Sequence, residues 1–256
     1  MEDDWGDRAK RFPDVSLPVG GERRILRSRM GSIGRRLVDI ATAGTGLLLL
    51  SPFALPLVVA LRLTGEGHVL YFQRRVGQGG KPFRICKLAT MLQDSENMPG
   101  GKVTLRNDPR LTPLGGLLRR SKLNELPQLW NVLVGEMTIV GPRPLPKVSL
   151  EMYPPDVQKV VLQSKPGLTG IASLVFRDEE AFVSDCGRDP IEFYKQVVFP
   201  YKGKLELWYQ QHRSLGTDLK IVFSTACLVV APSSDWILGW FKGLPARPDE
   251  LRGGRD

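Results

Sequence analysis

A long apolar run at 37–63 lies near the start of the chain, between two basic segments. A helix over 34–63 would measure about 45 Å at 1.5 Å per residue, which exceeds the roughly 30 Å hydrocarbon core of a bilayer. Length alone therefore leaves three paths open. The helix can cross a membrane with a kink, pack inside a soluble core, or enter a bilayer and turn back within it.

Two features of this run favour the re-entrant path. Pro52 and Pro56 each lack a backbone donor and clash with the carbonyl four residues earlier, and the Ser51 hydroxyl can satisfy a carbonyl freed in this way. Basic residues also flank both ends, and such flanks stay on the cytoplasmic side. A single span cannot satisfy both flanks, whereas a helix broken at Ser51-Pro52 can. The flanking cations are Arg23, Arg24, Arg27, Arg29, Arg35 and Arg36 before the run, and Arg62, Arg74, Arg75, Lys81 and Arg84 after it.

Beyond the apolar run, the pattern predicts an α+β protein that is predominantly helical. The segments VLYF and KPFRI indicate short strands on either side of the turn GQGG. Helical patterns cover 115–135, 153–163 and 190–212, and the last of these should break at Pro200. The segment KPGLTG is typical of a turn, and IASLVF, which follows it, resembles a strand.

Patterning divides the chain into five segments: a mobile tail at 1–24, the re-entrant membrane helix at 25–65, a cytosolic core at 66–180, a helical extension at 181–244 and a frayed tail at 245–256. Within the extension, the apolar stretch IVFSTACLVVA is too short to span a bilayer. The aromatic and basic residues that follow it are typical of a membrane interface. The extension is therefore interfacial, or else it ends in an ordinary core helix.

The charge balance is basic, with a net charge of +9 and a pI of about 9.6. Such a balance suits nucleic acid, anionic lipid or phosphorylated substrates. The basic residues flank a lipid-like segment and no nucleic-acid motif appears, so we expect no nucleic-acid partner. Cys86, Cys186 and Cys227 lie far apart and only two histidines accompany them, which argues against a zinc site and a disulfide framework and fits a cytosolic face.

Candidate chemistry gathers in the middle of the chain. Arg143 lies between two prolines, whose stiff backbone presents a guanidinium fork that suits phosphate oxygens. Glu125 is close in sequence to several cations, and such a carboxylate is suited to bind Mg²⁺ or to take part in phosphoryl chemistry. The acidic run at 178–180 either begins a solvated helix or belongs to a nucleotide or metal pocket.

Taken in order, these motifs resemble the bacterial sugar transferase family, the monotopic polyprenyl-phosphate phosphoglycosyl transferases. The resemblance covers roughly 25–177 and rests on RRLVDIATAGTGLLLLSPFALP, KLATM, SKLNELPQLWN, VGPRPL and KPGLTG. It implies a re-entrant helix broken at Ser51-Pro52 and docked on a cytosolic catalytic domain with interfacial helices. It also implies a location at the cytoplasmic face of the bacterial inner membrane.

The implied reaction transfers a sugar-1-phosphate from a UDP-sugar to undecaprenyl phosphate and releases UMP. This would be the first membrane step of surface polysaccharide or glycan synthesis. The partners implied are therefore undecaprenyl phosphate, a UDP-sugar and membrane lipids, and a homo-oligomer stays open. The family's Asp-Glu dyad, a nucleophile followed by an Mg²⁺ ligand, falls on Asn124 and Glu125. The basic residues that match the family's phosphate-binding positions are Lys87, Arg119, Arg143 and Arg177.

Two positions depart from the family pattern: Asn124 replaces the expected aspartate and Ala89 an expected arginine. An amide oxygen carries no full charge and is a poor nucleophile. Another carboxylate such as Glu125 can take over, or the lipid phosphate can attack directly with help from Mg²⁺. Alternatively, the chain is a non-catalytic membrane scaffold that binds nucleotide sugar or lipid phosphate, or the asparagine was introduced as a trap. The intact Glu125, Arg119 and Arg143 favour retained chemistry.

Overall fold

The computed structural model describes residues 22–95, 97–98, 108–184, 187, 189–231 and 235–251, so most of the predicted tail at 1–24 lies outside the described residues. Helices predominate and strands are few, which confirms the α+β class. The elements are α2 (Glu22–Thr64), β1 (Leu70–Val76), β2 (Pro82–Leu88), α3 (Gly115–Arg120), α4 (Gln128–Val134), β3 (Thr138–Val140), α5 (Lys147–Leu150), α6 (Pro155–Leu162), β4 (Gly167–Thr169), α7 (Ile171–Val175), α8 (Glu179–Ser184), α9 (Pro190–Phe193), α10 (Phe199–His212) and α11 (Leu215–Val230).

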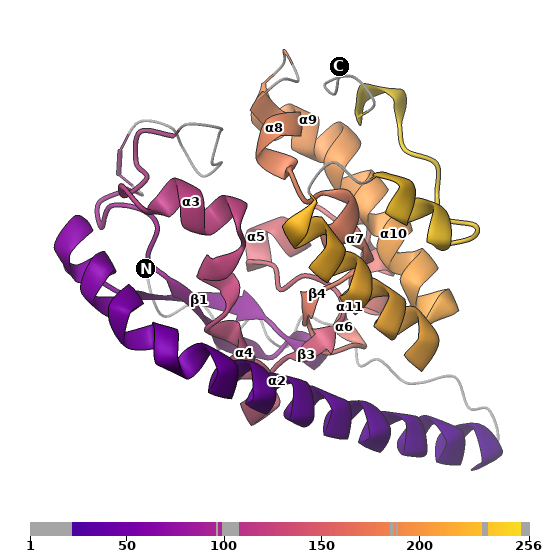
Figure 1. The fold of residues 1–256 in the computed structure, drawn as a ribbon. Helices are drawn as coiled ribbons and strands as arrows, with labels where there is room; N and C mark the ends of the chain where they lie inside the picture. The colour runs from indigo at the N-terminus through magenta and orange to yellow at the C-terminus, as the bar shows by residue number, and fades with distance from the viewer. Residues whose placement is uncertain are drawn as a thin grey trace.

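The apolar run forms α2, which continues through Pro52 and Pro56. Figure 1 shows it along one edge of the molecule as a bent but unbroken ribbon. Ser51 Oγ donates to the Leu48 carbonyl at 2.8 Å, the acceptor that Pro52 leaves without a backbone donor. The role of the serine follows the prediction, but the predicted break at Ser51-Pro52 is not present, because one helix runs through both prolines. The re-entrant path therefore stays a prediction.

The surface of α2 argues against a soluble core helix. The stretch Ile33–Thr64 is long and apolar enough to cross a membrane, and only 6% of its most apolar window is buried. Leu48, Leu49, Phe53 and Leu55 all expose most of their side chains. A helix that filled a soluble core would bury these residues. The alternative of a buried soluble helix is therefore disfavoured.

Polar contacts fix the first half of α2 to the rest of the protein. Arg36 donates to the Val132 and Leu133 carbonyls at 2.6 Å each, and both carbonyls lie in the last turn of α4. The buried Asp39 accepts from Thr138 Oγ1 at 2.9 Å and from the backbone of β3 at 2.8 Å. Because buried polar groups are expensive to leave unpaired, these bonds fix the register of the helix against β3 and α4.

The predicted hairpin is present. Strands β1 and β2 pair antiparallel from Leu70 opposite Leu88 to Val76 opposite Pro82, around the turn GQGG. A second, parallel pair joins β3 to β4, and Gly141 and Gly167 let the two backbones approach closely there, since a Cβ on Gly167 would lie 2.1 Å from the Gly141 nitrogen. This pairing brings the Pro-Arg-Pro loop after β3 beside the end of β1 (Figure 1).

Two sequence interpretations were wrong. The segment KPGLTG, predicted as a turn, contains β4, and IASLVF, predicted as a strand, forms α7. Ile171, Ala172, Leu174 and Val175 of α7 are all buried, so its short apolar run has no polar face to reveal a helical period. The helix predicted for 115–135 is also divided, into α3, a 3₁₀ turn at Leu123–Glu125 and α4. Pro127 immediately precedes α4, as expected for a residue that starts a helix.

The C-terminal helices share a core with the middle of the chain. The main hydrophobic cluster joins Val132 and Ile171 to Leu205 of α10 and Ile221 of α11. The chain is helical from 190 to 212, so the break predicted at Pro200 is wrong: a π-helical turn at Tyr194–Val198 leads directly into α10, and the proline lies in the first turn of that helix. Helix α11 buries Ile221 but exposes other apolar side chains, so the interfacial alternative for this stretch stays a prediction. The boundary at 180 stays a prediction.

Candidate phosphate-binding site

The candidate site forms where three segments meet at Glu125. This residue ends the 3₁₀ turn between α3 and α4, just after Lys122, whose backbone is left-handed with φ of 61°. Arg143 Nη2, from the loop after β3, donates to Glu125 Oε1 at 2.7 Å. Lys87 Nζ, near the end of β2, lies 3.9 Å from the same oxygen. The Glu125 side chain is only 12% exposed, so the contacts form a partly desolvated ion cluster.

The cluster around Glu125 contains more positive side chains than negative ones. Burial opposes ionisation of Glu125, but Arg143, Lys87 and Lys122 outweigh it and hold the pKa of that carboxyl well below its ordinary value. The pKa of Lys87 is lowered to about 7, chiefly by burial and in addition by Arg143, Arg75 and Arg119, while Glu125 acts in the opposite direction. The pKa of Arg75 falls to about 10 through burial and the nearby Arg143. Cations that disfavour each other in this way create a site for an anion.

Lys87 should take up a proton when an anion binds. At pH 8 the Lys87 amine, with a pKa of about 7, is mostly neutral, and a bound anion raises that pKa. At pH 6 it is already charged, so uptake should disappear. Calorimetry of sulfate binding in two buffers of different ionisation enthalpy measures the uptake. Lys87→Met should abolish it and Lys81→Met, on the exposed hairpin, should not; equal uptake in both variants would count against this assignment.

Asn124 adds an unusual polar atom beside Glu125. Its side chain is 7% exposed, and its Oδ1 has no hydrogen-bond partner among the described residues. A buried amide oxygen without a donor is expensive, and it suits a cation. Within the described part of the chain, no group of three or more His, Cys, Asp or Glu side chains could hold a metal. Asn124 and Glu125 offer oxygen atoms of the kind that Mg²⁺ prefers, and an Mg²⁺ site here stays a prediction.

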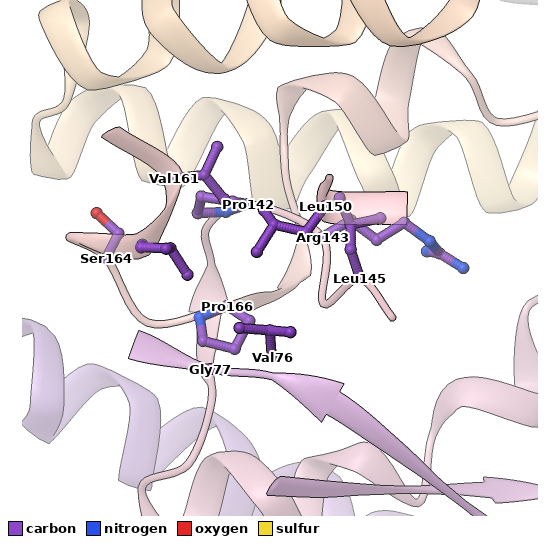
Figure 2. A pocket seen from close by; sticks show the side chains of 10 residues that line it. Val76, Gly77, Pro142, Arg143, Leu145, Leu150, Val161, Ser164 and Pro166 are labelled. Atoms are coloured by element: carbon purple, nitrogen blue, oxygen red, sulfur yellow. The ribbon is translucent and has the colours of Figure 1, made fainter. Parts of the chain in front are cut away.

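A separate, small hollow lined mostly by apolar residues lies behind the Pro-Arg-Pro loop. It is lined by Val76, Gly77, Pro142, Arg143, Leu145, Leu150, Val161, Leu162, Ser164 and Pro166. In Figure 2 the guanidinium of Arg143 points away from Val161, Val76 and Pro166. The hollow therefore lies against the apolar side of the loop. Arg143 extends from the opposite side of the loop toward Glu125.

Comparison with known proteins adds a direct result. The family model described as bacterial sugar transferase matches residues 30–232. The chain belongs to the bacterial sugar transferase family. It is 34% identical over 210 residues to the exopolysaccharide production protein ExoY of Rhizobium meliloti, which covers 77% of this chain and 85% of that protein. Family membership and the exposed apolar α2 support a membrane location.

Two other relatives of this sugar transferase carry more specific names. One is the UDP-glucose:undecaprenyl-phosphate glucose-1-phosphate transferase of Caulobacter vibrioides, 32% identical over 235 residues, which cover 88% of this chain and 83% of that protein. The Escherichia coli protein of the same name is 35% identical over 216 residues, which cover 83% of this chain and 42% of that protein. The match thus extends almost end to end in the Caulobacter relative.

The sugar transferase brings together only some of the predicted site residues. Lys87 and Arg143 surround Glu125, with Asn124 next to it in the chain, and Arg119 is near enough to lower the pKa of Lys87. Arg119 itself donates to Glu180 of α8, through Nε at 3.0 Å and through Nη2. No contact among the described residues joins Arg177 to this cluster. The phosphate-binding role of each residue stays a prediction.

Sequence reasoning missed several members of the site. Arg75 was noted only as a cation that flanks the apolar run, and Lys122 was one of the unnamed cations near Glu125 in sequence, whereas both act on the charge balance around Arg143. Glu179 and Glu180 were left between a solvated helix start and a nucleotide or metal pocket. The structure shows that they begin α8, and it pairs them with Lys202 and Arg119 rather than leaving them fully solvated. A pocket at these residues stays a prediction. The acidic run at 178–180, close to a predicted phosphate-binding arginine, was the available clue.

Proposed function

We propose that this sugar transferase moves a sugar-1-phosphate from a UDP-sugar to undecaprenyl phosphate, releases UMP, and so carries out the first membrane step of surface polysaccharide or glycan synthesis. The observation that carries the proposal is the cluster of Lys87, Lys122 and Arg143 around the single carboxylate of Glu125. Its excess positive charge suits a diphosphate. The names of the Caulobacter and Escherichia relatives supply the donor and acceptor classes.

In this proposal the cations orient the donor diphosphate. The planar fork of Arg143 and the ammonium of Lys87 bind its oxygens, and they stabilise charge that develops on the leaving UMP. Glu125 and the amide oxygen of Asn124 would hold Mg²⁺, which would neutralise charge on the diphosphate when bound. Glu125 keeps the fork of Arg143 aligned through its 2.7 Å hydrogen bond.

We further propose that an oxygen of undecaprenyl phosphate attacks the β-phosphorus of the donor directly. Asn124 is an amide, and the Glu125 oxygens are engaged by Arg143, so neither is a good nucleophile. The new bond joins the lipid phosphate oxygen to the β-phosphorus. The bond from that phosphorus to the bridging oxygen breaks, and UMP leaves with the bridging oxygen and its electron pair. The products are a lipid diphosphosugar and UMP.

The proposal is tested by UMP release from a panel of UDP-sugars, with the protein in lipid nanodiscs. We expect release with at least one donor, only in the presence of undecaprenyl phosphate and Mg²⁺. No UMP from any donor would reject the enzymatic proposal. Donor or lipid binding by calorimetry without any product would instead select the non-catalytic scaffold, which the amide at Asn124 motivates.

Asn124→Asp should retain or raise turnover, because it adds an anionic oxygen at the residue next to Glu125, where the family has its aspartate. It should also change the kinetics. A carboxylate at this position can attack the β-phosphorus itself, so a stoichiometric burst of UMP is expected without lipid acceptor. Rapid-quench measurement of UMP detects the burst. Asn124→Ala is the matched control and should show none, and a burst in the unmodified protein would refute direct attack by the lipid.

We also propose that α2 enters and leaves the bilayer at the cytoplasmic face by bending at Ser51-Pro52 when it is in the membrane. The two prolines, the Ser51 hydrogen bond to Leu48 and the basic residues at both ends support this path. The exposed apolar side chains of α11 and of the 3₁₀ turn at Asp235–Trp240 would rest at the same interface.

Topology can be measured by placing accessible tags at the two ends of the chain. Both tags should be protected from the periplasmic side. Replacing Pro52 and Pro56 together with alanine should straighten α2 and move the N-terminal tag across the membrane in a large share of molecules. Alanine at Pro245, outside the apolar run, is the control and should leave both tags inside. Tags on opposite sides in the unmodified protein would exclude the re-entrant path.

A further inference from the structure

Helix α8 brings two adjacent carboxylates to the border of the cation cluster. Glu179 Oε1 accepts from Lys202 Nζ of α10 at 2.6 Å. Glu180 Oε1 accepts from both Nε and Nη2 of Arg119, at the end of α3. Both carboxylates also act on Lys122, and Glu179 acts on Arg143. The two glutamates therefore belong to the electrostatic surroundings of Glu125, although α8 lies 54 or more positions further along the chain.

The first of these carboxylates is anchored. The Lys202 side chain is 8% exposed, and its ammonium lies 4.9 Å from the ring centre of Phe176 and 5.8 Å from that of Phe199. Burial opposes ionisation of Glu179, but Lys202 and Arg143 hold the pKa of its carboxyl below the ordinary value. A buried ion pair with ring contacts on the cation is costly to separate. This pair fixes α8 against α10.

The second carboxylate is exchangeable. Glu180 is 36% exposed and Arg119 is 25% exposed, so water reaches both sides of their ion pair. Pairs of this kind contribute little to stability and separate readily. Arg119 directs two of its donors at one oxygen of Glu180, in the same fork that binds a phosphate oxygen pair. A phosphate and the Glu180 carboxylate therefore compete for the same face of one guanidinium.

We propose that Glu180 is a placeholder for a donor phosphate: it occupies Arg119 in the free protein and yields that guanidinium to the diphosphate of a nucleoside diphosphate. Glu180 then sets how tightly the donor binds, because each binding event first breaks its ion pair. The anchored Glu179 keeps α8 in place, so the carboxylate returns to Arg119 when the anion leaves. The inference rests on the proposed function only in placing a donor diphosphate at this cluster.

Calorimetry with the full chain in lipid nanodiscs tests the placeholder. The probes are UDP and inorganic pyrophosphate, each with and without Mg²⁺. Glu180→Gln removes the competing charge but keeps the shape of the side chain, so the Kd for both probes should fall about two- to fivefold. Glu151→Gln makes the same charge change on an exposed residue after α5, and it should leave the Kd unchanged. In an Arg119→Gln background, Glu180→Gln should no longer tighten binding.

The opposing account makes the Arg119–Glu180 pair a permanent tie between α3 and α8. It predicts a lower Tm for Glu180→Gln with an unchanged or higher Kd, and that result overturns the placeholder. Weaker binding only when Mg²⁺ is present would make Glu180 a metal ligand instead, and a lack of binding by every variant would also refute the proposal. Tighter binding without UMP release would leave the placeholder standing and reject the proposed reaction. An unchanged Kd for Glu180→Gln together with normal UMP release would reject the placeholder and leave the proposed reaction standing.

Discussion

Glu125→Gln is expected to lower UMP release by at least on the order of 10³-fold. Arg143 and Lys87 both contact the carboxylate of Glu125. They keep it ionised although its side chain is only 12% exposed, because their positive charge outweighs the cost of burial. A neutral amide would lose the alignment of the Arg143 fork and the anionic oxygen proposed for Mg²⁺. Initial rates of UMP release at saturating UDP-sugar and lipid acceptor measure the loss.

The interpretation of Glu125→Gln requires that the variant be folded. Removing one partner of a buried ion cluster leaves unpaired charge and can cost about 3–5 kcal/mol, so circular dichroism and UDP binding must accompany the rates. Glu125→Asp keeps the charge and should retain the fold with partial activity. Glu151→Gln is the matched control and should leave the rate unchanged. A folded Glu125→Gln protein that keeps its rate to within about tenfold would remove Glu125 from the chemistry.

Arg143→Gln is expected to lower kcat/KM for the UDP-sugar by on the order of 10²–10³-fold. Its guanidinium is the strongest partner of Glu125, and it is proposed to bind the diphosphate with the rest of its fork. Losing this cation also raises the pKa of the Glu125 carboxyl toward its ordinary value. The acidic limb of the residual pH–rate profile should therefore move to higher pH, because Glu125 must be charged.

Two further variants separate charge from geometry at Arg143. Arg143→Lys keeps the charge without the planar fork, so its loss of kcat/KM should be intermediate. Arg84→Gln, an exposed arginine on β2, removes the same charge away from Glu125 and should have little effect. Equal losses in Arg143→Gln and Arg84→Gln would mean that only overall charge matters, and the assigned role of the fork would be lost.

Local rules predicted much of the fold. The β1–β2 hairpin and the bond from Ser51 to the Leu48 carbonyl follow from alternating apolar residues and from proline geometry, which depend on few neighbours. Helix α7 was missed because a fully buried helix and a buried strand have the same short apolar pattern. The division of 115–135 depends on a left-handed lysine, Lys122, and lysine rarely adopts that conformation, so its sequence position gives no warning.

The candidate site was also predictable where it depends on local sequence motifs, and not where it depends on packing between distant segments. Lys87, Glu125 and Arg143 were proposed from family motifs, and the structure places them within one ion cluster. The pairing of Arg119 with Glu180, 61 positions away, depends on how α8 packs against the end of α3, and residue types alone cannot give that packing. Packing likewise decides that Arg177 makes no contact with the cluster among the described residues, and the sequence motif alone cannot give this.

The most direct test of the central claim follows the β-phosphorus of the donor. A UDP-sugar labelled with ³²P at its β-phosphate is incubated with the protein, Mg²⁺ and undecaprenyl phosphate, and the lipid and nucleotide are then separated. Transfer of a sugar-1-phosphate predicts that the label enters the lipid while unlabelled UMP is released, and that Glu125→Gln stops both. Label that stays in UDP while the sugar alone reaches the lipid would contradict the account.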